Sequence, residues 1–453
     1  MSILKRFLFV TITSSALVGS AAAQVRKIEY EKYTLPNGLK VILHKDNSVP
    51  VVAVTTLYHV GSKNEDTART GFAHFFEHLL FEGSANIKRG EFVEHVTNAG
   101  GGLNANTSQD RTFYYELLPS NQVKLGLWLE SERMMHAKIE DIGVNTQREV
   151  VKEEKRLRID NQPYGTRFTE LLKRAFPNNP YNWAPIGSMD HLNAAKLDEF
   201  MKFYNTYYVP NNCVLSIAGD IDVPAIKKLI EAYFGPIPKG KDVPRPSVKQ
   251  ASLGGEVRDI IQDNVQLPGV FQAYLGPKQQ SSDYYAFSLL SSILSDGQSS
   301  RFTKALVDEK QVAASASTFP LISEDAGLLI TNVIASLGVK PEDLEKEIDI
   351  VVNNMKTSLV GDRELQKVKN QVQTNLVNSN ATMAGIAERL ADYETYFGDA
   401  ELINTEIEKF NSVTSQQIMD VAKKYLNKEN RVVLYYVPKT VAKPKAASGT
   451  PTP

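Results

Sequence analysis

The 453-residue sequence has little cysteine, little excess charge and few long apolar runs, and each shortage excludes a class of protein. Its one cysteine, Cys213, excludes an intramolecular disulfide, and the surrounding segment NNCVLSIAG indicates a packed thiol rather than a nucleophile. A formal net charge of −1 argues against nucleic acid or an anionic membrane as the main partner. The apolar run at residues 7–18 is too short for an ordinary membrane span, so we expect no stable membrane insertion.

Residues 1–23 have the pattern of a secretory signal peptide. Lys5 and Arg6 form a basic start, the short apolar run follows, and Ala21–Ala23 offers small side chains for cleavage. An uncleaved N-terminal anchor is the alternative interpretation. We therefore expect a protein that is secreted across the inner membrane, with the periplasm as its location.

A proline-rich stretch, residues 236–255, divides the rest of the chain into residues 24–235 and residues 256–438. Proline removes a backbone donor and opposes helix, so this stretch predicts an extended linker. Its prolines are Pro236, Pro238, Pro244 and Pro246. The end of the chain, residues 439–453, lacks apolar side chains that could dock and is predicted to be disordered.

The two parts resemble copies of one unit. Near its end, each part has a segment that indicates the end of a helix, a polar turn and a strand. These segments are TYYVPNNCVLSIAG and KYLNKENRVVLYYV. The segment HFFEHLLFEG can be aligned with SLLSSILSDG, with Gly83 matched to Gly297. This alignment matches His74, Glu77 and His78 with serines at positions 288, 291 and 292. Strands lead, helices follow and strands close each part, an order that favours an α+β fold over a parallel βαβ series. Two unrelated α/β domains are the alternative.

A polar group interrupts the apolar segment GFAHFFEHLLFEGS, residues 71–84. In a helix, residues four apart share a face, so His74 and His78 project together with Glu77 beside them. The Phe and Leu residues around them predict burial, and buried imidazoles need polar partners. Zinc suits imidazoles at this spacing, and the order H-x-x-E-H is that of the inverzincins. Two core histidines bonded to backbone carbonyls are the alternative.

A third ligand has to come from another segment. NTQREVVKEEKRLRIDNQPYG, residues 145–165, predicts a helix that ends near Asn161–Pro163. Glu154 shares a helical face with more apolar residues than Glu153 does, so Glu154 is the better candidate for an inward carboxylate. Taken alone, this preference is weak.

Three segments, in this order, resemble the zinc-binding half of the pitrilysin/insulinase family of metallopeptidases. They are HFFEHLLFEGS, NAGGGLNANTSQDRTFYYELLP and QREVVKEEKR. The later GQSSRFTKALVDEKQ is similar to the second-domain signature of that family. The resemblance implies two homologous α/β domains, each a mostly antiparallel sheet with packed helices, that together form one half of a clam-shell peptidase. By motif position it implies one zinc per chain, with the ligands His74, His78 and Glu154 and the catalytic base Glu77.

The same resemblance implies further site residues. The segment GGGLNANTS is expected to run as an edge strand beside an extended substrate, with Asn104 and Ala105 as substrate contacts. Gln147 stands where the family commonly has a glutamate that supports the site, and an amide there adds no negative charge. Arg301 matches an arginine that holds the substrate, whereas Ser315 stands where a tyrosine is expected. For the segment GGGLNANTS, the alternative is an ordinary Gly-rich hairpin.

These observations predict a secreted zinc-dependent endopeptidase that hydrolyses peptides or unfolded polypeptide segments. Because Ser315 leaves a two-residue substrate clamp incomplete, the expected assembly is a heterodimer with a family member that lacks H-x-x-E-H but carries both Arg and Tyr. A homodimer is the alternative. The alternative function is a non-catalytic, peptide-binding or scaffolding subunit. The other histidines are not expected to bind metal, namely His44, His59, His95, His136 and His191.

Overall fold

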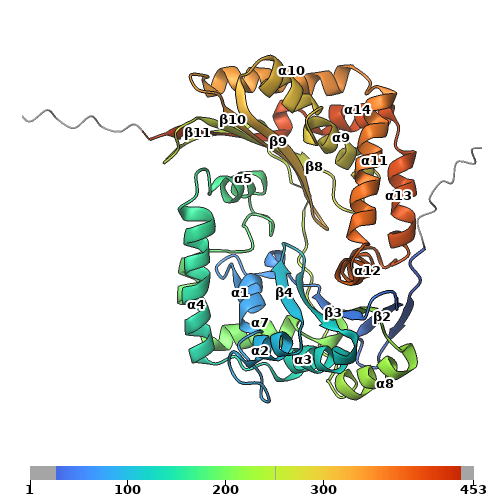
Figure 1. Cartoon of the computed structure of the whole chain (residues 1–453). Coiled ribbons are helices and arrows are strands. Elements are labelled where there is room, and N and C mark those ends of the chain that lie inside the picture. The colour runs from blue at the N-terminus through green and yellow to red at the C-terminus, as the bar shows by residue number, and fades with distance from the viewer. Residues whose placement is uncertain (1–26, 250, 440–453) are drawn as a thin grey trace, which may run out of the picture.

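The structure, a computed structural model, describes residues 27–249 and 251–439, which fold into two halves, each built on one β-sheet (Figure 1). The predicted signal peptide and the tail from residue 440 lie outside the described residues. Among the helices described, none combines the length and the hydropathy that a membrane crossing requires.

The first half carries a sheet of strand order β1-β2-β6-β3-β5-β4, with β2 and β6 parallel and the other neighbours antiparallel. Its elements are β1 (Glu31–Thr34), β2 (Lys40–Lys45), β3 (Val51–Tyr58), η1 (Ser62–Asn64), α1 (Phe72–Leu79), α2 (Glu91–Asn98), β4 (Gly102–Thr107), β5 (Thr112–Pro119), η2 (Ser120–Gln122), α3 (Val123–His136), α4 (Asp141–Lys155), η3 (Arg156–Asp160), α5 (Arg167–Ala175), α6 (Met189–Ala194), α7 (Leu197–Tyr207), η4 (Pro210–Asn212), β6 (Cys213–Gly219) and α8 (Val223–Phe234).

The second half carries a sheet of strand order β7-β11-β8-β10-β9. Its elements are β7 (Val257–Asp263), β8 (Gly269–Gly276), α9 (Tyr284–Ser295), η5 (Thr303–Glu309), β9 (Ala313–Ile322), β10 (Gly327–Ala335), α10 (Pro341–Thr357), α11 (Asp362–Ser379), α12 (Met383–Phe397), α13 (Leu402–Ser412), α14 (Ser415–Tyr425), η6 (Lys428–Asn430) and β11 (Arg431–Pro438). Residues 236–249 and 251–256, between the two halves, form neither helix nor strand.

The two sheets have the same topology. The series β7-β11-β8-β10-β9 repeats β2-β6-β3-β5-β4, and in each half the first pair is parallel while the others are antiparallel. In each half a helix, α1 or α9, follows the central strand and precedes the edge hairpin. The predicted fold class, two homologous α/β domains with mostly antiparallel sheets, is therefore confirmed.

The central strands are buried on both faces, so each sheet needs a cover on either side. All seven residues of β6 are buried, as expected for a strand between two helical layers. Cys213, its first residue, has a buried thiol, and burial raises the pKa of that thiol, which confirms the expectation of a packed cysteine.

Each half supplies a helix that covers a face of the other half's sheet. Helix α12 packs against β3 and β6 of the first half, where Leu390 and Ala391 share an apolar cluster with Ala53. Helix α5 packs against β8 and β11 of the second half, where Leu172 joins Phe271. Figure 1 shows both exchanges. Since β3 and β6 correspond to β8 and β11, the exchange is reciprocal and locks the halves together.

A buried ammonium group also joins the halves. The side chain of Lys63 in η1 is only 2% exposed, and its Nζ lies 2.9 Å from Asp110 Oδ1 in the first half. The same Nζ lies 2.5 Å from Glu324 Oε2 and 3.0 Å from Asp325 Oδ2, both in the turn between β9 and β10. A charge this deeply buried is tolerated only because its partners surround it.

Lys63→Ala should lower the free energy of unfolding by about 3 kcal/mol or more, because it leaves three carboxylates without their buried cation. The matched control is Lys88→Ala, since the Lys88 side chain is 86% exposed and pairs with Glu91 on the surface. Urea unfolding of the two variants measures the difference. Equal effects of the two substitutions would contradict this account of the contact.

Candidate metal centre

Helix α1 is buried on most of its surface and polar on one side. Phe72 stacks on Phe200 of α7 with ring centroids 4.6 Å apart, and Phe76 stacks on Phe203 at 5.5 Å. These contacts fix the rotation of the helix, because the aromatic side must face α7. The remaining side carries His74, Glu77 and His78, all half-buried.

Helix α4 brings Glu154 to that polar side. Val151, one turn before Glu154, is fully buried in the core that also holds the apolar side of α1. Two other apolar residues near Glu154 are exposed, since Val150 is 43% and Leu157 57% exposed. The inward direction of Glu154 therefore follows from Val144 and Val151, the two apolar side chains of α4 that are buried in this core. The helical segment continues through the π-helical η3 and ends at Asp160, close to the predicted end.

One oxygen of Glu154 faces both imidazoles. Glu154 Oε2 lies 3.4 Å from His74 Nε2 and 3.4 Å from His78 Nε2, and the three possible ligand atoms are all within 4.8 Å of one another. Oε2 is buried and has no hydrogen-bond partner, while Oε1 is 2.6 Å from Arg158 Nη1. An orphaned carboxylate oxygen facing two ring nitrogens fits a metal ion held by all three. Within residues 27–249 and 251–439 this is the one cluster of its kind.

The protonation of these groups favours metal binding. Burial, with a smaller contribution from His78, lowers the pKa of His74 to about 4, so its imidazole is neutral at neutral pH. Contact with His78 lowers the pKa of Glu154, which keeps this carboxylate ionised. Neutral imidazoles and an ionised carboxylate are the forms that bind metal.

Glu77 lies beside this cluster and is held by the edge strand. The hydroxyl of Thr107, the last residue of β4, donates a hydrogen bond of 2.6 Å to Glu77 Oε2. Burial raises the pKa of Glu77, although the bond from Thr107 opposes the shift. Thr107 is a contact that sequence reasoning missed, because a hydroxyl in a Gly-rich segment gives no signal of what it touches.

Strand β4 is an edge strand, as predicted, since it pairs only with β5 among the described strands. Asn104 lies exposed on it, Ala105 is half-buried, and the Asn104 side chain accepts a hydrogen bond from the Ala105 backbone N–H. The open edge leaves backbone groups that an extended peptide can pair with. Substrate contact by these two residues stays a prediction.

Gln147 and Arg301 have partners other than the metal-binding group. Gln147 Nε2 donates to Glu82 Oε1 at 2.5 Å, and its Oε1 is buried without a hydrogen-bond partner. Arg301 forms a two-pronged pair with Glu364 of α11, at 3.0 Å and 2.8 Å. Ser315 lies exposed on β9 and pairs with Ile334. The roles expected for these residues stay predictions.

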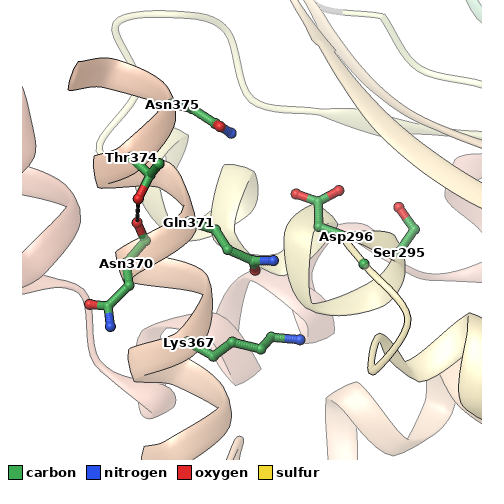
Figure 2. A pocket seen from close by; sticks show the side chains of 8 residues that line it. Ser295, Asp296, Lys367, Asn370, Gln371, Thr374 and Asn375 are labelled. Carbon is green, nitrogen blue, oxygen red and sulfur yellow. Dashed lines mark hydrogen bonds between the residues drawn. The ribbon is translucent and has the colours of Figure 1, made fainter. Parts of the chain in front are cut away.

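The second half has a polar cleft between the end of α9 and α11 (Figure 2). Amides, hydroxyls, one carboxylate and one ammonium group line it, from Ser295, Asp296, Gly297, Lys367, Asn370, Gln371, Thr374 and Asn375. The cleft offers no imidazole or thiolate, so its lining lacks the nitrogen and sulfur ligands typical of zinc.

The chain is similar to known peptidases over most of its length. The family profile described as "Insulinase (Peptidase family M16)" matches residues 40–186, and that described as "Peptidase M16 inactive domain" matches residues 194–372. The chain is 30% identical over 426 residues to the zinc protease PqqE of Helicobacter pylori, covering 93% of this chain and 96% of that protein. It is 24% identical to the mitochondrial-processing peptidase subunit beta of Blastocladiella emersonii, covering 92% of this chain and 90% of that protein.

Solved structures show the same fold. A protease from Helicobacter pylori superposes with a TM-score of 0.87 at 28% identity, covering 91% of this chain and 100% of that chain. The periplasmic protease PqqL from Escherichia coli superposes with a TM-score of 0.74 at 20% identity, covering 92% of this chain and 48% of that chain. At 20% identity, the similarity to PqqL is evidence of a shared fold only.

The purified protein should hold about one zinc ion per chain, and His74→Ala, His78→Ala and Glu154→Ala should each lose it. Elemental analysis of folded protein measures the loss. Glu153→Ala is the matched control, because Glu153 is the adjacent carboxylate, is 55% exposed and pairs with Arg156. Loss of zinc from Glu153→Ala with retention in Glu154→Ala would refute the choice of ligand.

Proposed function

Because the chain belongs to the M16 peptidase family, which contains insulinase, we propose that it is a zinc-dependent endopeptidase acting on peptides or unfolded polypeptide segments. The observation that carries the proposal is the convergence of His74, His78 and Glu154, with Glu77 beside them at the end of an open edge strand. A zinc ion bound there would lower the pKa of a bound water and polarise the scissile carbonyl.

The residues of this chain have distinct roles in the proposed reaction. Strand β4 pairs with the extended backbone of the substrate and places one peptide bond beside Glu77. The Glu77 carboxylate takes a proton from the attacking water and later gives it to the leaving amine. The Thr107 hydroxyl orients the carboxylate.

A catalytic role is favoured over a non-catalytic, scaffolding one. Glu77 is not needed to hold a metal, so a subunit that only binds peptide has no use for a half-buried carboxylate at this position. Helix α9 of the second half, which corresponds to α1, lacks this group of polar residues. It has serines at positions 288, 291 and 292.

The proposed location is the periplasm, after export by the signal peptide predicted for residues 1–23. The periplasmic protease PqqL of Escherichia coli has the same fold and is consistent with this location.

Glu77→Gln should retain zinc and the native fold while the rate of peptide cleavage falls by at least about a hundredfold. The control is Glu94→Gln, an exposed carboxylate on α2. The substrate is a mixed peptide library, and cleavage is followed by mass spectrometry. Undiminished turnover by zinc-loaded Glu77→Gln would refute the mechanism.

The pH profile of the wild type gives a second readout of the same residue. Glu77 must be ionised to accept a proton, so activity should fall as the pH drops through the pKa of Glu77. Burial raises that pKa, whereas the positive charge of a bound zinc ion would lower it, so the acid limb measures the balance of the two effects on Glu77.

The proposed assembly is a heterodimer with a family member that carries both the substrate-holding Arg and Tyr. Arg301 is present here, but Ser315 offers no phenol to stabilise the developing oxyanion, a contact worth about 3 kcal/mol where such a donor acts. Mass measurement of the complex isolated from its native source should find two different chains of similar size. A fully active assembly of this chain alone would refute the heterodimer and favour a homodimer.

A further inference from the structure

The N-terminal end of α1 is capped by a residue outside the helix. Gly71, at the N-cap, has a positive φ of 99° and no side chain to accept a hydrogen bond. The buried carboxylate of Glu65 takes this role: Oε2 accepts from the Gly71 N–H and Oε1 from the Ala73 N–H, both at 2.8 Å. The two oxygens of Glu65 thereby satisfy N–H groups of the first helical turn, as a capping side chain does.

Trp183 completes the surroundings of that carboxylate. Its indole Nε1 donates to Glu65 Oε2 at 2.8 Å and lies 3.1 Å from the Ser62 carbonyl. Burial raises the pKa of Glu65 to about 8, while the N–H donors act in the opposite direction because they favour the carboxylate. With donors on both oxygens, the position of Glu65 is determined from several sides.

The residues after Trp183 close around the same end of α1. A Cβ on Gly187 would lie 2.3 Å from both Gly71 N and Gly71 Cα, so the two glycine backbones are in direct contact. Thr70, just before Gly71, donates its N–H to His191 Nδ1 at 3.2 Å and accepts from the Ser188 N–H at 3.1 Å. Segment 183–191 and Glu65, together named the collar, therefore hold the start of α1 from several directions.

We propose that the collar is a positioning device that fixes α1 against α4 and thereby sets the geometry of His74, His78 and Glu77. The proposal rests on the proposed metal site. The first histidine follows directly on Ala73, whose N–H is bound by Glu65, so a shift of the helix start displaces both imidazoles relative to Glu154. Metal geometry and catalysis tolerate only small displacements, and supporting contacts of this kind affect both.

Two substitutions test the collar without removing a ligand. Glu65→Gln keeps the size of the side chain but turns an amide N–H₂ toward N–H donors, so part of the cap is lost. Trp183→Phe removes the indole donor together with part of the ring. The matched control is Trp128→Phe, which changes the second of the two tryptophans, located on α3.

In the metal-free protein, hydrogen–deuterium exchange in a peptide covering residues 71–79 should be about tenfold faster in Glu65→Gln, because backbone donors lose their acceptor. The dissociation constant for zinc, measured by chelator competition, should rise about tenfold. In the zinc-loaded enzyme kcat should fall about tenfold while KM stays within about twofold. Trp183→Phe should have smaller effects in the same direction, and little effect when added to Glu65→Gln, since both act through one carboxylate.

Unchanged exchange and zinc affinity in folded Glu65→Gln and Trp183→Phe would overturn the proposal, as would equal effects in Trp128→Phe. If Glu65→Gln does not fold, Trp183→Phe decides by the same two measurements. A wild type that binds no zinc and cleaves no peptide would refute the proposed function. The exchange measurement on metal-free protein would then still test whether the collar holds α1.

Discussion

The candidate site depends on how α1 is fixed against α4. An apolar helix that carries two imidazoles and a carboxylate on one side is stable only if that side meets polar partners. Stacking of Phe72 and Phe76 on α7 sets the rotation of α1, and burial of Val144 and Val151 sets that of α4. Glu154 Oε2 is thereby brought to 3.4 Å from both imidazoles, where it has no hydrogen-bond donor. A metal ion is the partner that fits this arrangement.

The second half supports this arrangement although it lacks a comparable set of zinc ligands among its described residues. Its helix α12 covers the face of the first sheet that contains Ala53, and its β9–β10 turn supplies two of the carboxylates around Lys63. Removing the second half would expose an apolar face and a buried cation together, both of which cost free energy. A reciprocal exchange of this kind explains how a half without the metal-binding residues can remain necessary for the half that has them.

Much of the site follows from local spacing in the sequence. His74, Glu77 and His78 share one side of a helix because of their order, and the glycines before Leu103 indicate the edge strand. Glu154 is harder to predict, because only Val144 and Val151 are buried apolar side chains of α4, while Val150 and Leu157 are exposed.

The remaining features depend on contacts between residues far apart in the chain. Periodicity indicates that α5 and α12 each have an apolar face, but it does not say which sheet that face covers. Glu65 is contacted by Trp183, and Thr107 contacts Glu77. In neither pair does the spacing along the sequence indicate the contact. Gln147 donates to Glu82, a contact that the sequence does not indicate.

X-ray diffraction at the zinc absorption edge, from crystals of the zinc-loaded protein, tests the central claim most directly. The account predicts one anomalous peak per chain, about 2.0–2.2 Å from His74 Nε2, His78 Nε2 and a carboxylate oxygen of Glu154, with Glu77 outside the coordination sphere. A peak bound by other residues, or no peak in protein that cleaves peptides, would contradict it.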